Sequence, residues 1–247
     1  MPQYVMLNNV AHKDLRVITR YGAEFGDNTG TVLTCPTEFA EIQKEYPIFF
    51  RRDRDTGEYH AVALLGFEKN ENLFLDNNRW NAVYLPAVVA RGPFLIGFQE
   101  RQIDGEIRKE PVIHVDLDHP RVSQVEGEPA FLPHGGNTPY LGHIAAVLRD
   151  IHDGLEVAKA MFAAFTAMNL IEPVKVEIKL NEQEAYGLTG LHTVSPEKLR
   201  DLDATSLYKL NQAGFLQLAF FVVASHGNVR KLMAMKQRRR GVQAANG

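Results

Sequence analysis

The clearest pattern in the sequence is a run of apolar residues spaced alternately three and four positions apart between residues 139 and 170. This spacing places side chains on one face of an α-helix, so it predicts a helical seam about 25 residues long. The apolar positions are Leu141, Ile144, Leu148, Ile151, Leu155, Ala158, Phe162 and Phe165. We expect this face to pack on a sheet; the alternative is a homodimer seam along helix 139–170.

Short apolar runs separated by turn residues predict two β-hairpins in the first half of the chain. In each, Asp and Gly residues lie between the runs, a combination that favours a turn between antiparallel strands. The predicted strands are residues 48–52 with 60–67, and residues 94–101 with 106–117, the latter pair around Asp104-Gly105. Alternation of apolar and charged residues predicts a half-exposed strand over 174–180, followed by a second strand near 186–193.

Proline, capping residues and apolar periodicity predict several shorter helices. They cover residues 36–46, 84–90, a short segment opening at Ser195-Pro196, residues 205–212, 215–224 and 228–239. Residues 215–224 are apolar on all sides, which predicts a buried helix. The last helix ends in a run of cations, and we expect this run to form a solvated tail. The cations are Lys236, Arg238, Arg239 and Arg240.

Together these elements predict an α+β fold. An antiparallel sheet built from hairpins occupies the N-terminal half, and a long helix and a helical C-terminal region pack against it. At 247 residues the chain is long enough to bury a sizeable core without metals or disulfides. We therefore expect one domain over residues 1–247.

Charge and composition narrow the possible partners. A formal net charge of −3 gives no overall attraction to nucleic acid, so no nucleic-acid partner is expected. No stretch approaches the ~18–20 apolar residues of a membrane span. The chain has one cysteine, which excludes an intrachain disulfide, and its first residues do not resemble a signal peptide. We expect a cytoplasmic location.

One aromatic and basic tract is the candidate ligand site. Arg79, Trp80 and Tyr84 lie close together in sequence, and Arg91 follows shortly after. Aromatic faces with nearby guanidinium groups are typical of ligand pockets. The alternative is that the aromatic side chains hold a short helix on the sheet.

Two other segments carry candidate chemistry. His114, Asp116 and Asp118 would share one face of a strand, where an imidazole and two carboxylates could bind a divalent metal; a solvent-facing polar edge is the alternative. Cys35 precedes Pro36 at a predicted helix start, a position that can lower a thiol pKa, but we expect a small buried or half-buried residue there rather than a reactive nucleophile. No cofactor is expected.

Several segments, from about residue 4 to residue 235, resemble the SapC family of bacterial proteins. They are residues 46–50, residues 79–86, residues 91–94, residues 127–131, Leu180-Asn181 with Gly190-Leu191, and residues 225–232. The resemblance implies an accessory protein linked to a bacterial surface layer. It also implies protein partners among halogenase-like and outer-membrane receptor systems, and it supplies no catalytic residues.

We favour a non-enzymatic accessory protein that binds a small molecule or a peptide beside Trp80. One alternative is a metal-assisted enzyme centred on His114, Asp116 and Asp118. The other is a structural or assembly protein of the bacterial surface layer.

Overall fold

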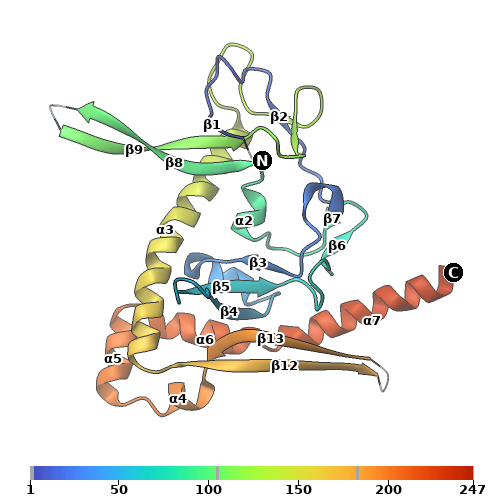
Figure 1. Ribbon diagram of the computed structural model, residues 1–247, viewed down its shortest axis with the longest axis vertical. Helices are drawn as coiled ribbons and strands as arrows, with labels where there is room; N and C mark the ends of the chain where they lie inside the picture. The colour runs from blue at the N-terminus through green and yellow to red at the C-terminus, as the bar shows by residue number, and fades with distance from the viewer. Residues whose placement is uncertain (1–2, 104–105, 182–183, 247) are drawn as a thin grey trace. The chain divides into compact units, whose positions relative to one another are not determined.

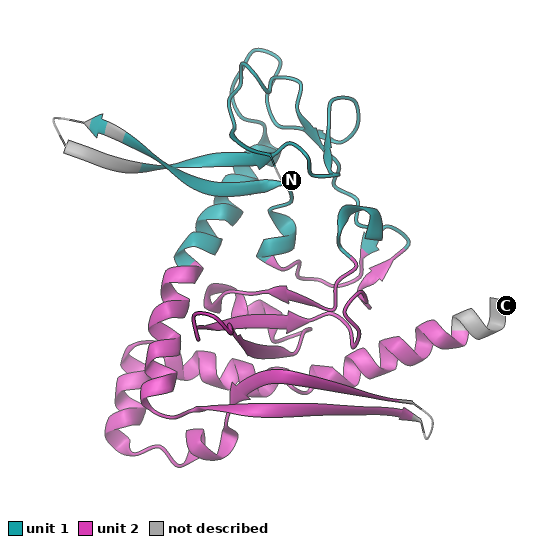
Figure 2. Ribbon diagram, viewed as in Figure 1, with its two compact units in different colours: residues 1–27, 77–79, 87–153 teal, residues 28–76, 80–86, 154–247 magenta. Residues whose placement is uncertain are grey.

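The computed structural model describes residues 3–103, 106–181 and 184–246, which form helices and antiparallel strands (Figure 1). The predicted α+β class is confirmed. The chain divides into two units, shown in different colours in Figure 2, and each unit is described by itself. The predicted turn at Asp104-Gly105 lies outside the described residues.

Unit 1 comprises residues 1–27, 77–79 and 87–153 and contains two small antiparallel sheets. The first, in the order β1-β9-β8, consists of β1 (Tyr4–Met6), β9 (Glu106–Asp116) and β8 (Phe94–Ile103). The second, in the order β10-β2-β11, consists of β10 (Val122–Ser123), β2 (Arg16–Val17) and β11 (Glu128–Pro129). The pairing of β8 with β9, from Phe94 opposite Val115 outward, confirms the second predicted hairpin.

Unit 2 comprises residues 28–76, 80–86 and 154–247, and a five-stranded antiparallel sheet forms its centre. The strands, in spatial order, are β12 (Ile171–Asn181), β13 (Glu184–Val194), β4 (Ile48–Arg52), β5 (Tyr59–Leu64) and β3 (Thr31–Leu33). The β4–β5 pair confirms the first predicted hairpin. Pairing of Leu191 with Arg51 joins β13 to β4, so strands from both halves of the chain share this sheet. The sequence did not predict that union.

The predicted long helix is confirmed as α3 (Pro139–Ala167). Five of the eight seam side chains are buried: Leu141, Ile144 and Leu148 lie in the core of unit 1, and Phe162 and Phe165 lie in the core of unit 2. These five side chains are therefore unavailable to a second copy. Leu155, which is 48% exposed, remains for the homodimer hypothesis.

The remaining elements are short, apart from the last two helices. They are η1 (Ala23–Phe25), η2 (Pro36–Glu38), α1 (Phe39–Ile42), β6 (Leu75–Asp76), β7 (Arg79–Trp80), α2 (Ala87–Ala90), α4 (Pro196–Arg200), α5 (Ala204–Gln212), α6 (Phe215–Ser225) and α7 (Asn228–Asn246). The helix predicted over 84–90 begins only at Ala87, because Leu85 precedes a proline and so disfavours helical geometry.

The prediction that residues 215–224 are buried on all sides is wrong. In α6, Ala219, Val222 and Ser225 are buried on one face, whereas Phe220 is 54% exposed. A helix at the edge of a core buries only the face turned toward its neighbours, even when its other positions are also apolar. The exposed phenylalanine thus reflects packing that composition cannot indicate.

The predicted solvated tail is wrong for two of its four cations. Lys236 is buried and donates to Glu68 at 3.0 Å and to Glu71, while Arg239 donates to the backbone carbonyls of Asn72 at 3.1 Å and of Leu73 at 3.3 Å. Carboxylates and carbonyls that are withdrawn from water need hydrogen-bond donors. Lys236 and Arg239 of α7 supply these donors to residues 68–73, which follow β5. Arg238 and Arg240 are exposed, as predicted.

Burial alone would lower the pKa of Lys236, but its hydrogen bonds to Glu71 and Glu68 outweigh that effect and raise the pKa. The ammonium is therefore the stable form of this buried side chain.

Among the described residues, no helix has both the length and the apolar character needed to cross a membrane.

Replacing Lys236→Ala should lower the free energy of unfolding by about 3 kcal/mol, because Glu71 would remain buried without its cationic partner. Since folding raises the pKa of Lys236, this contribution should be complete below pH about 10.4 and lost as the pH rises further. Chemical denaturation across that pH range measures both effects. Arg230→Ala, which removes an exposed cation from the same helix, is the control and should change stability little.

Candidate functional site

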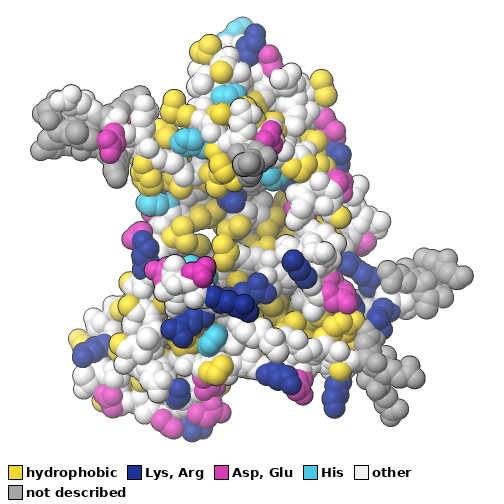
Figure 3. Space-filling view, viewed as in Figure 1, with side chains coloured by type: hydrophobic (Ala, Val, Ile, Leu, Met, Phe, Trp, Pro, Cys, Tyr) yellow, Lys and Arg dark blue, Asp and Glu magenta, His cyan; other side chains and the backbone are white. Residues whose placement is uncertain are grey.

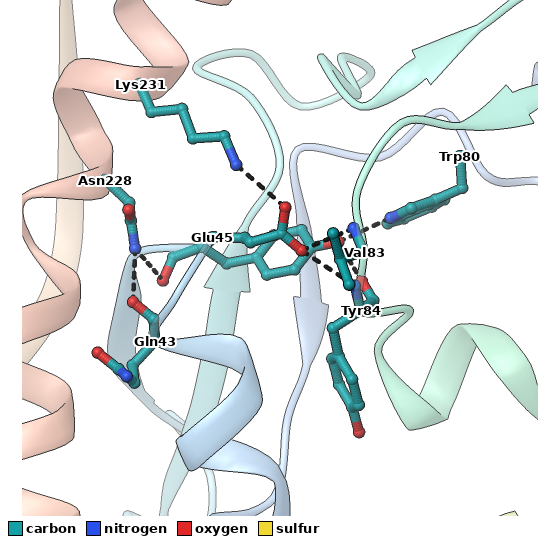
Figure 4. Close-up of polar contacts among 8 residues, drawn as sticks. Gln43, Glu45, Trp80, Val83, Tyr84, Asn228 and Lys231 are labelled. Atoms are coloured by element: carbon teal, nitrogen blue, oxygen red, sulfur yellow. Dashed lines mark hydrogen bonds and ion pairs between the residues drawn. The ribbon is translucent and has the colours of Figure 1, made fainter.

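Residues 80–84, within the predicted ligand tract, belong to unit 2 and are held there by hydrogen bonds and ring stacking (Figure 4). Trp80 stacks on Phe74 with 9° between the ring planes, and its indole N–H donates to the Tyr46 hydroxyl at 2.7 Å. That hydroxyl in turn donates to the backbone carbonyl of Tyr84 at 2.6 Å. The fully buried Tyr46 thereby joins both ends of the segment.

The Glu45 carboxylate holds the middle of the same segment. One oxygen accepts the backbone N–H groups of Val83 at 2.8 Å and Tyr84 at 3.0 Å, and the other lies 3.2 Å from the Lys231 ammonium (Figure 4). These two contacts fix the backbone of the segment shortly before α2.

A second carboxylate, that of Glu38, holds the side chain of Tyr84. Glu38 is buried and accepts hydrogen bonds from the Tyr84 hydroxyl at 2.9 Å, the Thr34 hydroxyl at 2.7 Å and the Cys35 N–H at 3.1 Å. Three donors offset the cost of burying a carboxylate. Tyr84 is thus fixed at its backbone by Glu45 and Tyr46 and at its hydroxyl by Glu38.

Burial also affects the titration of the Tyr46 phenol. Desolvation raises its pKa strongly, and the hydrogen bond from Trp80 only partly opposes that rise. Tyr46 therefore stays neutral and keeps both hydrogen bonds over the physiological pH range. The aromatic pair of the tract acts as part of the core of unit 2.

The outer side of the segment borders a surface groove of about 470 Å³. Its lining includes Trp80, Ala82, Val83, Lys231, Met235 and Arg238. Val83 is 97% exposed although its backbone is anchored, and Met235 is partly buried against the core. Two cations from α7 therefore flank an apolar surface that the Glu45 contacts hold in place.

The four predicted ligand residues divide between the two units. Trp80 and Tyr84 belong to unit 2 and are brought together through Tyr46, whereas Arg79 and Arg91 belong to unit 1. Arg79 is exposed. The Arg91 guanidinium donates to the Phe94 carbonyl at 2.7 Å, and burial lowers its pKa.

Only two of the three predicted metal ligands share a strand face: His114 and Asp116 are two residues apart in β9, whereas Asp118 lies in the turn that follows. The Asp116 carboxylate accepts the backbone N–H groups of Gln3 at 3.0 Å and Asp118 at 3.2 Å. His114 lies against Gly97, where a Cβ atom would come within 2.3 Å of the imidazole. Among the residues that the structure describes, no group of three or more His, Cys, Asp or Glu side chains is arranged to hold a metal ion.

A comparison with protein families identifies the chain: the SapC family model matches residues 7–232. The chain belongs to the SapC family. The match includes the segment 80–84 and Lys231, whereas the α7 groove residues Met235 and Arg238 lie beyond it. No solved structure matches this SapC protein.

Sequence reasoning missed the residues that organise the site in this SapC protein. Glu45 has the pattern of an ordinary exposed acid, and Lys231 that of an ordinary helix cation. The sequence contains one local signal, the aromatic Tyr46 directly before a proline, but nothing in it links positions 45 and 231. Only the tertiary fold brings that pair together.

Replacing Tyr46→Phe should lower the free energy of unfolding by about 2 kcal/mol, because the Trp80 N–H and the Tyr84 carbonyl both lose their partner. Denaturation followed by the fluorescence of Trp80, the single tryptophan, reports the change locally. The control is Tyr208→Phe, which removes a hydroxyl from an exposed side chain and should be neutral. Equal effects of the two substitutions would contradict the proposed role of Tyr46.

Cys35 should be unreactive in the folded protein, in agreement with the buried residue that the sequence pattern favours over a reactive thiol. Cys35 is buried, and burial, with a smaller contribution from Glu38, raises its pKa to about 12. Because the thiolate is the reactive species, labelling with iodoacetamide at pH 8 should require unfolding. Labelling at the rate of a small-molecule thiol under native conditions would disprove this expectation.

Proposed function

We propose that this SapC protein is a non-catalytic binding protein whose groove beside Trp80 holds a short segment of a partner protein. The observation that carries the proposal is the exposure of Val83 on an anchored backbone. An apolar side chain presented by a preformed segment loses little conformational entropy when a partner covers it. Exposed apolar surface with a polar rim is a feature of protein interaction sites.

The charges at the groove favour an acidic partner segment. Lys231 is already paired with Glu45, but Arg238 is exposed and lines the groove from α7. A carboxylate beside an apolar side chain would complement Arg238 and Val83 together. We therefore propose a peptide that combines Asp or Glu with a large apolar residue.

The proposal includes an accessory role, in which the bound segment belongs to another protein of the same system. The family resemblance supports this part, since it implies partners among halogenase-like proteins and outer-membrane receptor systems. The polar groups of the segment support a non-catalytic role, because the Trp80 N–H and the Tyr84 hydroxyl are engaged by Tyr46 and Glu38.

A displayed library of short random peptides provides the test. Peptides selected by the wild-type protein should be enriched in Asp, Glu and large apolar residues. Val83→Ser should weaken their binding about tenfold, which is the value of one buried aliphatic side chain. Arg238→Ala should weaken binding severalfold. Trp80→Ala is less informative, because Trp80 also packs on Phe74.

Val125→Ser is the matched control, since Val125 is 89% exposed and belongs to unit 1. It should leave peptide binding unchanged. If no peptide is selected, or if the selected peptides bind Val83→Ser as tightly as the wild type, the proposal fails.

A further inference from the structure

The central sheet of unit 2 opens where β13 leaves β4. The two strands pair only at Leu191 with Arg51 and at His192 with Phe50. Directly before Leu191, β13 carries a bulge: the register shifts opposite Lys175, and Gly190 adopts a φ of +73°. A bulge bends its strand away from the regular ladder. Residues 184–188 of β13 consequently pair with β12 alone.

A pocket of about 360 Å³ lies at this opening, large enough for a small molecule. Three buried apolar side chains line it: Leu64 from β5, Phe67 from the loop that follows, and Leu191 from β13. The polar lining includes Arg51, Lys69, Thr31 and the carboxylate Glu68, which pairs with Lys236. The pocket therefore combines apolar surface with two cations, one acid and hydroxyl groups.

Arg51 is the feature that suggests a ligand. It is exposed, and its guanidinium has no hydrogen-bond or ion-pair partner within the described part of the chain. Its neighbour Arg52 differs, because Arg52 donates to the Gly57 carbonyl at 3.0 Å and lies over the Tyr59 ring. Arg51 is thus positioned at the end of a paired strand segment with all of its side-chain donors available.

The surrounding charges leave a net positive surface. Arg51 also lines a second pocket of about 670 Å³, which it shares with Arg54 and His60. Figure 3 shows Lys and Arg side chains gathered over the β4–β5 hairpin. Two nearby acids have partners of their own: Asp53 accepts backbone N–H groups within its turn, and Glu68 pairs with Lys236. In the second pocket, whose lining also includes Asp55, three arginines face two aspartates.

We propose that the pocket beside Arg51 binds a small organic anion with an apolar body. The planar guanidinium can donate two parallel hydrogen bonds to a carboxylate or a phosphate, and Lys69 adds a second positive charge. The apolar part of the ligand packs against Leu64, Phe67 and Leu191. This site is separate from the peptide groove, since the two share no lining residue.

Calorimetric titration with hexanoate, hexyl phosphate, inorganic phosphate and hexanol tests the proposal. Hexanoate or hexyl phosphate should bind saturably at one site, and the preferred one of the two identifies the anionic group. Hexanol and inorganic phosphate should each bind at least about tenfold more weakly, since hexanol lacks the anionic group and inorganic phosphate lacks the apolar chain.

The variant Arg51→Ala should weaken binding of the preferred anion about tenfold or more, and Arg51→Lys should restore only part of it, because an ammonium lacks the guanidinium fork. Arg54→Ala is the matched control: it removes an equal charge nearby but lines only the second pocket. Thermal unfolding of each variant verifies folding. Absence of saturable binding by either organic anion, or equal losses for Arg51→Ala and Arg54→Ala, would overturn the assignment.

Discussion

Residues 43–47, which connect α1 to β4, determine how the C-terminal helices and the Trp80 segment are held in unit 2. Backbone groups in and next to this connection take their hydrogen-bond partners from α6 and α7, near the C-terminal end of the chain. The Ile48 N–H donates to the Ser225 hydroxyl at 2.8 Å. The Asn228 side chain donates to the Gln43 carbonyl at 2.8 Å and to the Tyr46 carbonyl at 3.3 Å. A buried backbone group without a partner costs about 1–3 kcal/mol, so these contacts hold α6 and α7 against the sheet.

Once that connection is fixed, Glu45 and Tyr46 have defined orientations, and the segment at Trp80 follows from them. Tyr46 directs its hydroxyl to Trp80 and Tyr84, while the neighbouring Glu45 accepts the backbone of Val83. Lys231, one helical turn after Asn228, closes the arrangement by pairing with Glu45. The surface of the groove is therefore determined by interactions made beneath it.

The sequence predicted individual elements well and their tertiary partners poorly. The seam of α3 and the two Asp-Gly-type hairpins are local periodic signals, and both appear in the structure. The sequence did not predict that Lys236 and Arg239 would be hydrogen-bonded within the fold, because the carbonyls and carboxylates that bind them lie more than a hundred residues away in sequence. At Trp80 the aromatic side chains of the tract make core contacts, and composition could not distinguish a ligand contact from a core contact.

The two candidate sites differ in whether their polar groups already have partners within the protein, and this difference determines which kind of ligand each site favours. In the segment at Trp80 the polar atoms point inward and stabilise the fold, which leaves an apolar side chain and flanking cations for recognition. At Arg51 the apolar groups are buried, and the exposed arginine lines the pocket. An apolar groove with flanking cations suits a partner chain, whereas an unpaired guanidinium beside buried apolar side chains suits a small anion. Only a ligand with its own negative charge offsets the desolvation of that guanidinium when the ligand covers it.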